Sequence, residues 1–290
     1  MKVWIDGKVV EGGSPEARIS VLDHGLLYGD GVFEGIRVYG GRVFRLPDHL
    51  TRIGNAARAI GLTIPGGPPA LEKVVIETVR AHGNREAYVR LLVTRGEGEL
   101  GVDPTSCHDP RIVCIVDDIR LYSEEKRRVG IDMLTSSLRR PAADMLDPRV
   151  KSLNYLNSVL AKREARLRGA DEALLLNAAG MVAEAAVANL FTVKDDVLAT
   201  PPVTDGALEG ITRSSVMVLA DELGIPAREV TLGRFDLLAA DEVFLTGSGA
   251  RIIAVATLDG QPIGVRGEHP VTDRLWDAFV PYAERHGTPV

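Results

Sequence analysis

The 290-residue chain is poor in cysteine and in aromatic residues, and it has no long apolar run. Its two cysteines, Cys107 and Cys114, do not have the spacing of a metal site or a redox pair. No apolar run approaches the ~18 residues that cross a bilayer, and the first residues have no apolar core of a secretory signal. We therefore expect a cytoplasmic protein without a metal ion and without a membrane partner.

An excess of charge of one sign is also missing. The chain carries 34 Lys and Arg residues against 40 Asp and Glu residues, a formal net charge of −6, and the two signs are well mixed. No stripe of basic residues offers the surface that nucleic acid requires, so we expect no nucleic-acid partner. What is present is the composition of a globular protein, with 45% hydrophobic and 26% charged residues, which allows a sizeable core.

Hydrophobic periodicity divides the first part of the chain into short strands and two amphipathic helices. We expect strands at 2–5, 8–10, 31–39, 42–45, 87–94 and 111–116, and helices at about 47–60 and 69–82. The polar, glycine-rich segment 95–110 between two of these strands is long for a loop of a compact domain, which suggests that it has a function.

The second part of the chain repeats this mixture with longer elements. We expect strands at 129–135, 173–177, 181–193, 197–199, 242–246 and 252–257, and helices at 153–168, 211–223 and 271–284. Because strands and helices do not alternate strictly, the pattern predicts an α+β protein. We expect an N-terminal domain over 1–116, a linker over 117–130 and a C-terminal domain over 131–290.

Two of the expected strands place an arginine on the same face as aromatic side chains. The two-residue period puts Phe33 and Arg37 on one face of the strand 31–39, and Tyr88 and Arg90 on one face of the strand 87–94. An arginine on such a strand either forms a structural ion pair or faces a polar cavity. These residues alone leave both readings open.

Three further segments are weak indications when each is taken singly. Gly210 opens onto a helix that contains Thr212, and free amide groups at a helix start suit a phosphate. The turn 246–249 is built of small residues that let a ligand approach the backbone. Lys151 stands just before a helix, where an exposed lysine is commonplace. Most joints and turns of these kinds have no ligand.

Several segments together resemble the class IV aminotransferases, which are enzymes of pyridoxal-phosphate fold type IV. The resemblance rests on Asp23–Arg37, on Lys151–Asn157, on Glu184 with the segment 189–191, and on Gly210–Arg213. These motifs follow one another in the order of that family and extend along essentially the whole chain. The resemblance therefore implies the two-domain fold of type IV and pyridoxal 5'-phosphate as the cofactor.

The resemblance also implies a role for each matching residue of the cofactor site. Lys151 is expected to bind the cofactor as a Schiff base and then to act as the base and acid that moves the substrate α-proton. Glu184 is expected to face the pyridine nitrogen and to keep it protonated. The remaining cofactor-binding residues are Arg52, Ile211, Thr212 and Ser248 at the phosphate, Tyr155 at the 3-oxygen of the ring, and Leu208.

On the substrate side the sequence is most similar to branched-chain amino acid aminotransferases. The segments 33–37, 88–90 and 95–104 resemble that group, and the arginine–histidine pair of the D-specific enzymes is not seen in the loop. The implied reaction takes L-leucine, L-isoleucine or L-valine with 2-oxoglutarate to a branched-chain 2-oxo acid and L-glutamate, in branched-chain amino acid biosynthesis. The implied substrate-binding residues are Tyr28, Phe33, Gly35, Arg37, Tyr88, Arg90, Leu100, Val102, Ser248 and Gly249.

Within that set, the aromatic residues are expected to wall an apolar pocket, and the amide groups at Ser248 and Gly249 to take the α-carboxylate. Arg90 is expected to bind the distal carboxylate of 2-oxoglutarate or glutamate, directly or by orienting Tyr28. Leu100 and Val102 are expected to cover the pocket of a partner subunit, so the resemblance implies a homodimer or a higher homo-oligomer.

Two departures from the branched-chain pattern bear on the substrate. The segment 185–188 is Ala-Ala-Val-Ala where the family is glycine-rich, and 248–251 is Ser-Gly-Ala-Arg where the family has Thr-Ala-Ala-Glu. We expect these changes to alter substrate preference or cofactor affinity. The alternatives within the fold are a D-amino-acid or (R)-amine transaminase and an aminodeoxychorismate lyase, and outside it a non-catalytic descendant.

Overall fold

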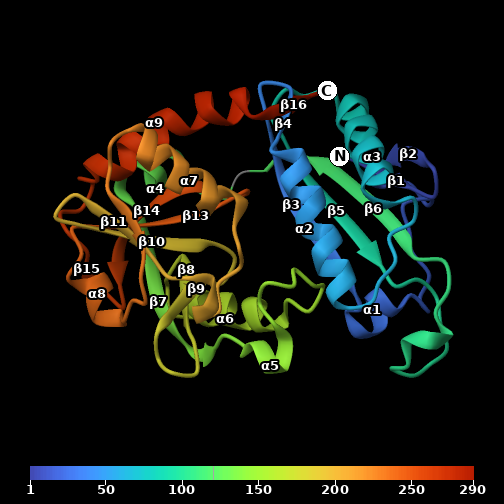
Figure 1. The fold of residues 1–290 in the computed structure, drawn as a ribbon, viewed down its shortest axis with the longest axis horizontal. Helices are drawn as coiled ribbons and strands as arrows, with labels where there is room; N and C mark the ends of the chain where they lie inside the picture. The colour runs from blue at the N-terminus through green and yellow to red at the C-terminus, as the bar shows by residue number, and fades with distance from the viewer. Residues whose placement is uncertain (120) are drawn as a thin grey trace. The chain divides into compact units, whose positions relative to one another are not determined.

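The structure is a computed structural model that describes residues 1–119 and 121–290 (Figure 1). Over these residues the chain forms two compact units. The N-terminal unit comprises Met1–Ile119, Val150–Asn154 and Ala283–Val290, and the C-terminal unit comprises Arg120–Arg149 and Tyr155–Tyr282. Each unit combines a sheet with helices, which confirms the predicted α+β class.

The N-terminal unit is built, in its described residues, on a seven-stranded antiparallel sheet. In sheet order the strands are β16 (Gly287–Pro289), β4 (Arg42–Phe44), β3 (Gly31–Tyr39), β5 (Ala87–Thr94), β6 (Arg111–Asp117), β1 (Lys2–Ile5) and β2 (Lys8–Glu11). The helices are α1 (His24–Tyr28), α2 (Leu46–Ala59), α3 (Gly67–His82) and the short 3-10 turn η1 (Pro104–Ser106).

The two faces of β3 have different roles. Val32, Ile36 and Val38 point to one face and share a buried apolar cluster with Leu50 and Ile53 of α2, which lies along β3 (Figure 1). The alternate residues, from Phe33 to Arg37, therefore point to the other face. The apolar period of two in β3 and of about 3.6 in α2 thus fixes which side chains are available for a site.

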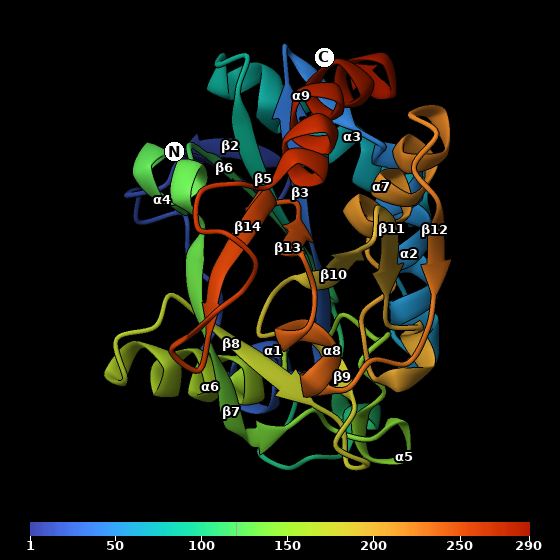
Figure 2. The same ribbon diagram turned by 90° about the vertical axis from the view of Figure 1, so that its left-hand side faces the viewer.

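The C-terminal unit contains, in its described residues, a nine-stranded mixed sheet (Figure 2). In sheet order the strands are β12 (Ala227–Glu229), β11 (Val197–Thr200), β10 (Asn189–Lys194), β13 (Glu242–Gly247), β14 (Arg251–Leu258), β7 (Ile131–Arg139), β8 (Glu172–Leu176) and β9 (Val182–Ala185), and β15 (Gln261–Pro262) pairs with β14. The pairings β14–β7, β7–β8 and β11–β12 are parallel.

The helical elements of this unit are α4 (Glu124–Val129), α5 (Ala143–Leu146), α6 (Leu156–Leu167), η2 (Val203–Asp205), α7 (Ile211–Glu222), α8 (Arg234–Leu238) and α9 (Pro270–Arg285), whose last residues belong to the N-terminal unit. Among the described residues, no helix is both long and apolar enough to cross a bilayer.

Two expected elements differ from the structure. The single strand expected over 181–193 is two strands, because Ala185 N donates to Ala188 O at 2.8 Å and closes a tight turn between β9 and β10. The helix expected from residue 153 begins at Leu156, because Leu153 N instead donates to Gly31 O at 2.9 Å. Residues 150–154 are thereby bound to β3, and Lys151 becomes part of the N-terminal unit.

Candidate active site

Lys151 lies beside the face of β3 that carries Phe33, and backbone contacts hold it there. Phe33 N donates to Lys151 O at 3.0 Å, and Ser152 forms an isolated bridge with Val32. The Lys151 Nζ atom lies 4.4 Å from the centroid of the Phe33 ring. The strand therefore fixes the position of the lysine next to an apolar aromatic surface.

The predicted strand-face residues of β3 and β5 come together. The guanidinium carbon of Arg90 lies 4.5 Å from the Phe33 ring centroid and 5.8 Å from that of Tyr88. Gly35 is opposite Arg90 in the register and Arg37 is opposite Tyr88. A Cβ atom at Gly35 would collide with the Tyr88 hydroxyl, so the glycine makes room for that side chain. The Phe33 ring is thus close to both an amine and a guanidinium.

Tyr28, Leu100 and Val102 lie in an exposed region formed by α1 and the loop 95–110. Tyr28 ends α1, and its hydroxyl accepts from Gly101 N at 2.9 Å. The ring Nε2 atom of His24 lies 2.9 Å from Glu99 O. Leu100 and Val102 are 80% and 81% exposed. The two contacts from α1 hold the tip of loop 95–110 with its apolar side chains in solvent.

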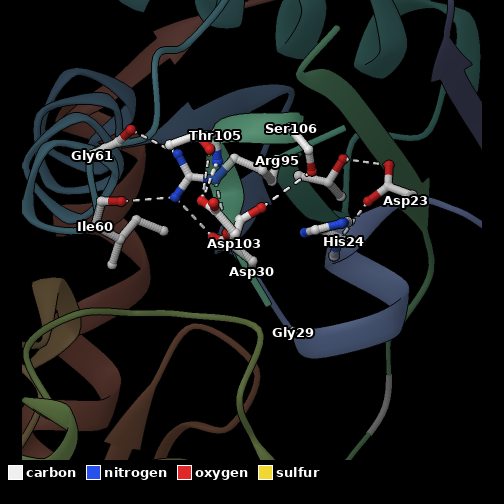
Figure 3. Close-up of polar contacts among 12 residues, drawn as sticks. Asp23, His24, Gly29, Asp30, Ile60, Gly61, Arg95, Asp103, Thr105 and Ser106 are labelled. Carbon is white, nitrogen blue, oxygen red and sulfur yellow. Dashed lines mark hydrogen bonds and ion pairs between the residues drawn. The ribbon is translucent and has the colours of Figure 1, made fainter. Parts of the chain in front are cut away.

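The start of this loop is anchored by Arg95 (Figure 3). Its guanidinium donates to both carboxylate oxygens of Asp30, at 2.8 and 3.0 Å, and to the carbonyls of Ile60 and Gly61, each at 2.7 Å. These two carbonyls lie at the end of α2, where a cation suits the unpaired carbonyl groups. The arginine therefore ties the loop to the helix that carries Arg52.

A buried carboxylate cluster lies on the other face of β3, against α2. Arg52 donates to both oxygens of Glu34, from Nε and from Nη2, each at 2.7 Å. The His49 Nδ1 atom lies 2.7 Å from the Glu34 Oε2 atom. The side chains of Glu34 and His49 are 0% and 1% exposed, and that of Arg52 is 13% exposed. His49 and Arg52 are one turn apart on α2, which lets them reach the same carboxylate.

The charge state of this cluster follows from its surroundings. Burial raises the pKa of Glu34, but the charge of Arg52, with the hydrogen bonds of Arg52 and His49, lowers it to about 2. Burial, together with the charges of Arg52 and Lys151, lowers the pKa of His49 below its usual value of 6.5 against the opposing effect of Glu34, so His49 is neutral at pH 7 and donates from Nδ1 to the ionised carboxylate. Its Nε2 atom is buried, and no hydrogen-bond partner for it occurs within residues 1–119 and 121–290.

Glu184 of β9 is the centre of a second buried cluster, in the C-terminal unit. Its Oε1 atom lies 2.6 Å from the Nη2 atom of Arg140. Its Oε2 atom accepts from Asn189 Nδ2 at 3.1 Å and from Leu208 N at 3.2 Å. Asn189 also donates to Leu208 O at 2.8 Å. The predicted residues Glu184 and Leu208 are therefore brought together, and Arg140 and Asn189 join them.

Sequence reasoning missed the roles of Arg140 and Asn189. Asn189 was visible as part of the motif around 189–191, but its side-chain contacts were not. Arg140 follows β7 and stands next to Pro141 without any motif of its own. A signal for Arg140 exists only in the fold, because it lies 44 positions from Glu184 in the sequence.

The start of α7 is a buried helix end beside this cluster. Gly210 is the N-cap residue, and a glycine has no side chain with which to bond the first amide groups. Ile211 and Thr212 are 8% and 4% exposed. A Cβ atom at Gly210 would collide with the Asn189 side-chain oxygen, so Gly210 allows the helix end to pack on Asn189. Unbonded amide groups at a helix start suit an anion.

Ser248 and Gly249 lie in the half-buried turn between β13 and β14. Arg251, which follows this turn, has a φ of +62°, and its guanidinium carbon lies 6.0 Å from the ring centroid of Trp276 on α9. Arg127 lies 5.0 Å from the same ring. Tyr155 is the half-buried N-cap residue of α6.

No group of three or more His, Cys, Asp or Glu residues within 1–119 and 121–290 is arranged to hold a metal ion. What the sites offer is an amine beside an aromatic face, a buried carboxylate that accepts from charged and neutral donors, and a helix end suited to an anion. This is the chemistry that a phosphorylated pyridine aldehyde requires of a protein.

Comparison with known proteins supports this chemistry. Residues 31–258 match the family model described as amino-transferase class IV. A putative branched-chain-amino-acid aminotransferase of Methanocaldococcus jannaschii is 47% identical over 280 residues, which cover 96% of this chain and 95% of the relative.

Solved structures agree with the sequence comparison. The crystal structure of the Escherichia coli branched-chain amino acid aminotransferase has a TM-score of 0.93 at 35% identity, covering 99% of this chain and 95% of that one. The branched-chain amino acid aminotransferase of Thermoproteus uzoniensis, solved with norvaline, has a TM-score of 0.90 at 37% identity, covering 99% and 97%. The chain therefore belongs to the class IV aminotransferase family.

Proposed function

We propose that this chain is a branched-chain amino acid aminotransferase. It transfers the amino group of L-leucine, L-isoleucine or L-valine to 2-oxoglutarate, giving a branched-chain 2-oxo acid and L-glutamate. The observation that carries the proposal is the Lys151 amine lying 4.4 Å from the Phe33 ring, on a strand face shared with Tyr88 and Arg90. That face offers apolar surface next to the reactive amine and a cation for a second carboxylate.

Class IV aminotransferases use pyridoxal 5'-phosphate. The donor set of this chain fits the group: the Lys151 amine for the aldehyde, the buried Glu184 carboxylate for the ring nitrogen, and the glycine-capped start of α7 for the phosphate. When bound, the cofactor supplies an aromatic system that takes up the electron pair left when the substrate α-proton is removed. Tyr155 and Ser248 complete the proposed set.

Arg52 is proposed to bind the phosphate with one edge only. Its Nε and Nη2 atoms donate to Glu34, so this edge of the guanidinium is not the one assigned to the phosphate. The carboxylate and His49 fix the plane of the guanidinium, which lowers the entropy cost of binding an anion there. The remaining charge for the phosphate comes from the amide groups of Ile211 and Thr212 at the start of α7.

Lys151 is proposed to act as the base that would take the substrate α-proton and as the acid that would give it back. A lysine that shuttles a proton must stay within reach of the atom that loses it and of the atom that receives it. The bond from Phe33 N to Lys151 O fixes its backbone, and the Phe33 ring excludes water from one side of the amine. The stereochemical course depends on this fixed position.

The substrate side is proposed to use two kinds of contact. The amide groups at Ser248 and Gly249 bind the α-carboxylate, and Arg90 binds the distal carboxylate of glutamate. Tyr28, Phe33 and Tyr88 provide apolar surface for a branched side chain, with Gly35 making room for Tyr88 and Arg37 opposite it in the register.

We also propose a cytoplasmic homodimer or higher homo-oligomer. Leu100 and Val102 are 80% and 81% exposed on a loop whose tip is held by α1. An apolar tip that is fixed and solvated in one chain suits a contact with a second copy.

The test is an amino-donor panel with the holoenzyme and 2-oxoglutarate, comparing L-leucine, D-alanine and (R)-1-phenylethylamine. We expect L-leucine to give the largest kcat/KM. Faster turnover of D-alanine or of the amine would overturn the substrate assignment. A colourless protein with no absorbance change on borohydride reduction would overturn the enzyme assignment itself.

A further inference from the structure

Arg140 holds the carboxylate that is assigned to the cofactor ring, and we propose that it is a positioning residue that acts through Glu184. This inference rests on the proposed function. The cofactor ring nitrogen and the Glu184 carboxylate would share one proton, and Arg140 keeps that proton on the nitrogen rather than on the carboxylate. Arg140 itself is not assigned to any contact with substrate or cofactor.

The geometry of the pair is that of a strong buried interaction. The Arg140 Nη2 and Glu184 Oε1 atoms are 2.6 Å apart, and the two side chains are 10% and 5% exposed. Water screens such a pair poorly, so the positive charge strongly lowers the free energy of the ionised carboxylate. An exposed ion pair would have a much smaller effect.

The guanidinium is oriented by contacts beyond the carboxylate. Arg140 Nε donates to Gly206 O and Arg140 Nη1 donates to Ser158 Oγ, each at 3.3 Å. The Arg140 Cγ atom would lie 3.4 Å from a Cβ atom at Gly206, which has a φ of +104°. The arginine therefore has one defined position, fixed by α6, by the segment after η2 and by β9.

The other groups at Glu184 also donate hydrogen bonds. Asn189 Nδ2 and Leu208 N donate to the Oε2 atom, at 3.1 and 3.2 Å. Both are neutral, so they orient the carboxylate without adding a full charge. Arg140 contributes a full positive charge, so orientation and electrostatics can be separated by substitution.

With the cofactor bound, one proton would be shared between the Glu184 carboxylate and the ring nitrogen. An ionised Glu184 accepts a hydrogen bond from a protonated nitrogen, whereas a protonated Glu184 donates to a neutral nitrogen; the proton moves between two atoms and no other bond changes. The Arg140 charge favours the first arrangement, because it stabilises the carboxylate anion. A protonated ring withdraws electrons more strongly than a neutral one, so the arrangement affects removal of the substrate α-proton.

The experiment uses holoenzyme reconstituted with cofactor labelled with ¹⁵N at the ring nitrogen. Arg140→Met removes the charge, Arg140→Lys keeps it, and Arg140→Gln removes it while keeping a hydrogen-bond donor. Arg166→Met is the matched control, because Arg166 pairs with Asp171 at 3.2 Å in the same unit but its side chain is 54% exposed. The readouts are the ¹⁵N chemical shift, kcat and KM for L-leucine, and the unfolding temperature.

We expect Arg140→Met and Arg140→Gln to shift the ¹⁵N resonance towards that of a neutral pyridine. We expect kcat to fall on the order of tenfold, a change in free energy equal to that of about one pKa unit. The change in KM should be smaller. Arg140→Lys should retain the protonated resonance, and Arg166→Met should match the wild type in the ¹⁵N chemical shift, in kcat and in KM.

The inference is overturned if either charge-removing variant binds cofactor and keeps the protonated resonance. It is equally overturned if Arg140→Lys loses that resonance as fully as Arg140→Met, because the role would then be one of shape rather than charge. Each of these outcomes leaves the wild-type activity towards L-leucine intact. Failure of the wild type in the donor panel would instead overturn the proposed function.

Discussion

The two units each contain a buried glutamate paired with an arginine, and the two pairs are built differently. In the N-terminal unit Arg52 reaches both oxygens of Glu34, which His49 also contacts. In the C-terminal unit Arg140 reaches one oxygen of Glu184, and neutral donors reach the other. The first arrangement fixes the plane of an arginine, and the second fixes the orientation of a carboxylate.

Both pairs are largely buried, and the exposed fractions agree with the assigned ligand-binding member only in the first pair. The Glu34 side chain is 0% exposed and its arginine is 13% exposed, so the arginine is the member that can reach a ligand. Glu184 and Arg140 are 5% and 10% exposed, and the carboxylate is the member assigned to the cofactor. A buried ion pair alone contributes little net stability, whereas removing one member leaves a buried charge. The pairs are therefore sensitive points for both stability and cofactor binding.

Lys151→Ala should have the largest effect and should leave both pairs unchanged. It removes the amine that we assign to the proton transfer, so we expect kcat to fall by roughly 10²–10⁴-fold, the usual contribution of general acid–base catalysis. The unfolding temperature of the apoprotein should stay close to that of the wild type, because Lys151 is half-buried and is held through its backbone. A retained kcat would contradict the assignment of Lys151.

Glu34→Gln should break the first pair and cost more stability than Glu184→Gln. It leaves the Arg52 charge largely buried without its carboxylate, which costs roughly 3–5 kcal/mol. Glu184→Gln also leaves a largely buried arginine charge, that of Arg140, but the new amide oxygen still accepts from the two neutral donors, so we expect a loss at the lower end of the same range, about 3 kcal/mol. Urea unfolding of the two apoproteins measures the difference. Equal losses would mean that the two pairs are equivalent, contrary to the comparison.

Acid should remove the contribution of Glu34 over a defined range of pH. Its pKa is 4.5 in the unfolded reference and about 2 in the folded protein. A lowered carboxyl pKa gives stability that is present above pH 4.5 and is lost as the pH falls towards 2, about 3 kcal/mol at roughly 1.4 kcal/mol per pKa unit. His49 acts in the same direction below its usual pKa of 6.5, because burial lowers its folded pKa.

The measurement is urea unfolding of the wild type and of Glu34→Gln between pH 7 and pH 3. The stability difference between the two proteins should shrink as the pH falls below 4.5. A difference that stays constant over this range would show that the Glu34 carboxyl does not have a lowered pKa.

Gly210→Ala should disturb the second pair through its neutral donors. The backbone at Gly210 accepts an L-residue, with a φ of −74°, but the new Cβ atom would collide with the Asn189 oxygen. Such overpacking costs typically ~1–3 kcal/mol and should also weaken cofactor binding, because Asn189 holds Glu184 and Leu208. Gly54→Ala is the control, since a Cβ atom there meets no atom within 4 Å and α2 should gain about 0.5–1 kcal/mol.

Both arms of this test are measured by the unfolding temperature and by cofactor retained on dialysis. Equal effects of the two alanines would show that the contact of Gly210 with Asn189 does not matter.

The sequence predicted some elements with nearly correct bounds and others with wrong bounds. Clear apolar periods and turn glycines, which are local signals, predicted strands β3 and β5 and helix α3. The division of 181–193 into β9 and β10 depends on one backbone bond, from Ala185 to Ala188, that no local pattern indicates. The start of α6 was expected too early because segment 150–154 is bound by β3, a partner more than a hundred positions away.

For the candidate site, the resemblance named the residues but not their partners. Glu184 and Arg52 were predicted, whereas Arg140, His49 and Glu34 received no role. Arg140 is distant from Glu184 in the sequence, Glu34 lies within the motif Asp23–Arg37 without a role of its own, and His49 lies in no motif. Pairing of charges in a core depends on which faces the fold brings together, and periodicity alone does not specify it.

Arg251→Glu is expected to have the smallest effect, and it extends the comparison to an arginine near an aromatic ring. The Arg251 guanidinium lies 6.0 Å from the Trp276 ring, an interaction worth roughly 0.5–1 kcal/mol at an exposed site. A glutamate would lose that contact and place a negative charge after the turn that we assign to the substrate carboxylate. We expect the KM for L-leucine to rise about two- to fivefold, as roughly 0.5–1 kcal/mol implies. Arg251→Lys is the control, and unchanged KM, substrate range and cofactor affinity in Arg251→Glu would show that this departure from the branched-chain pattern has no effect on binding.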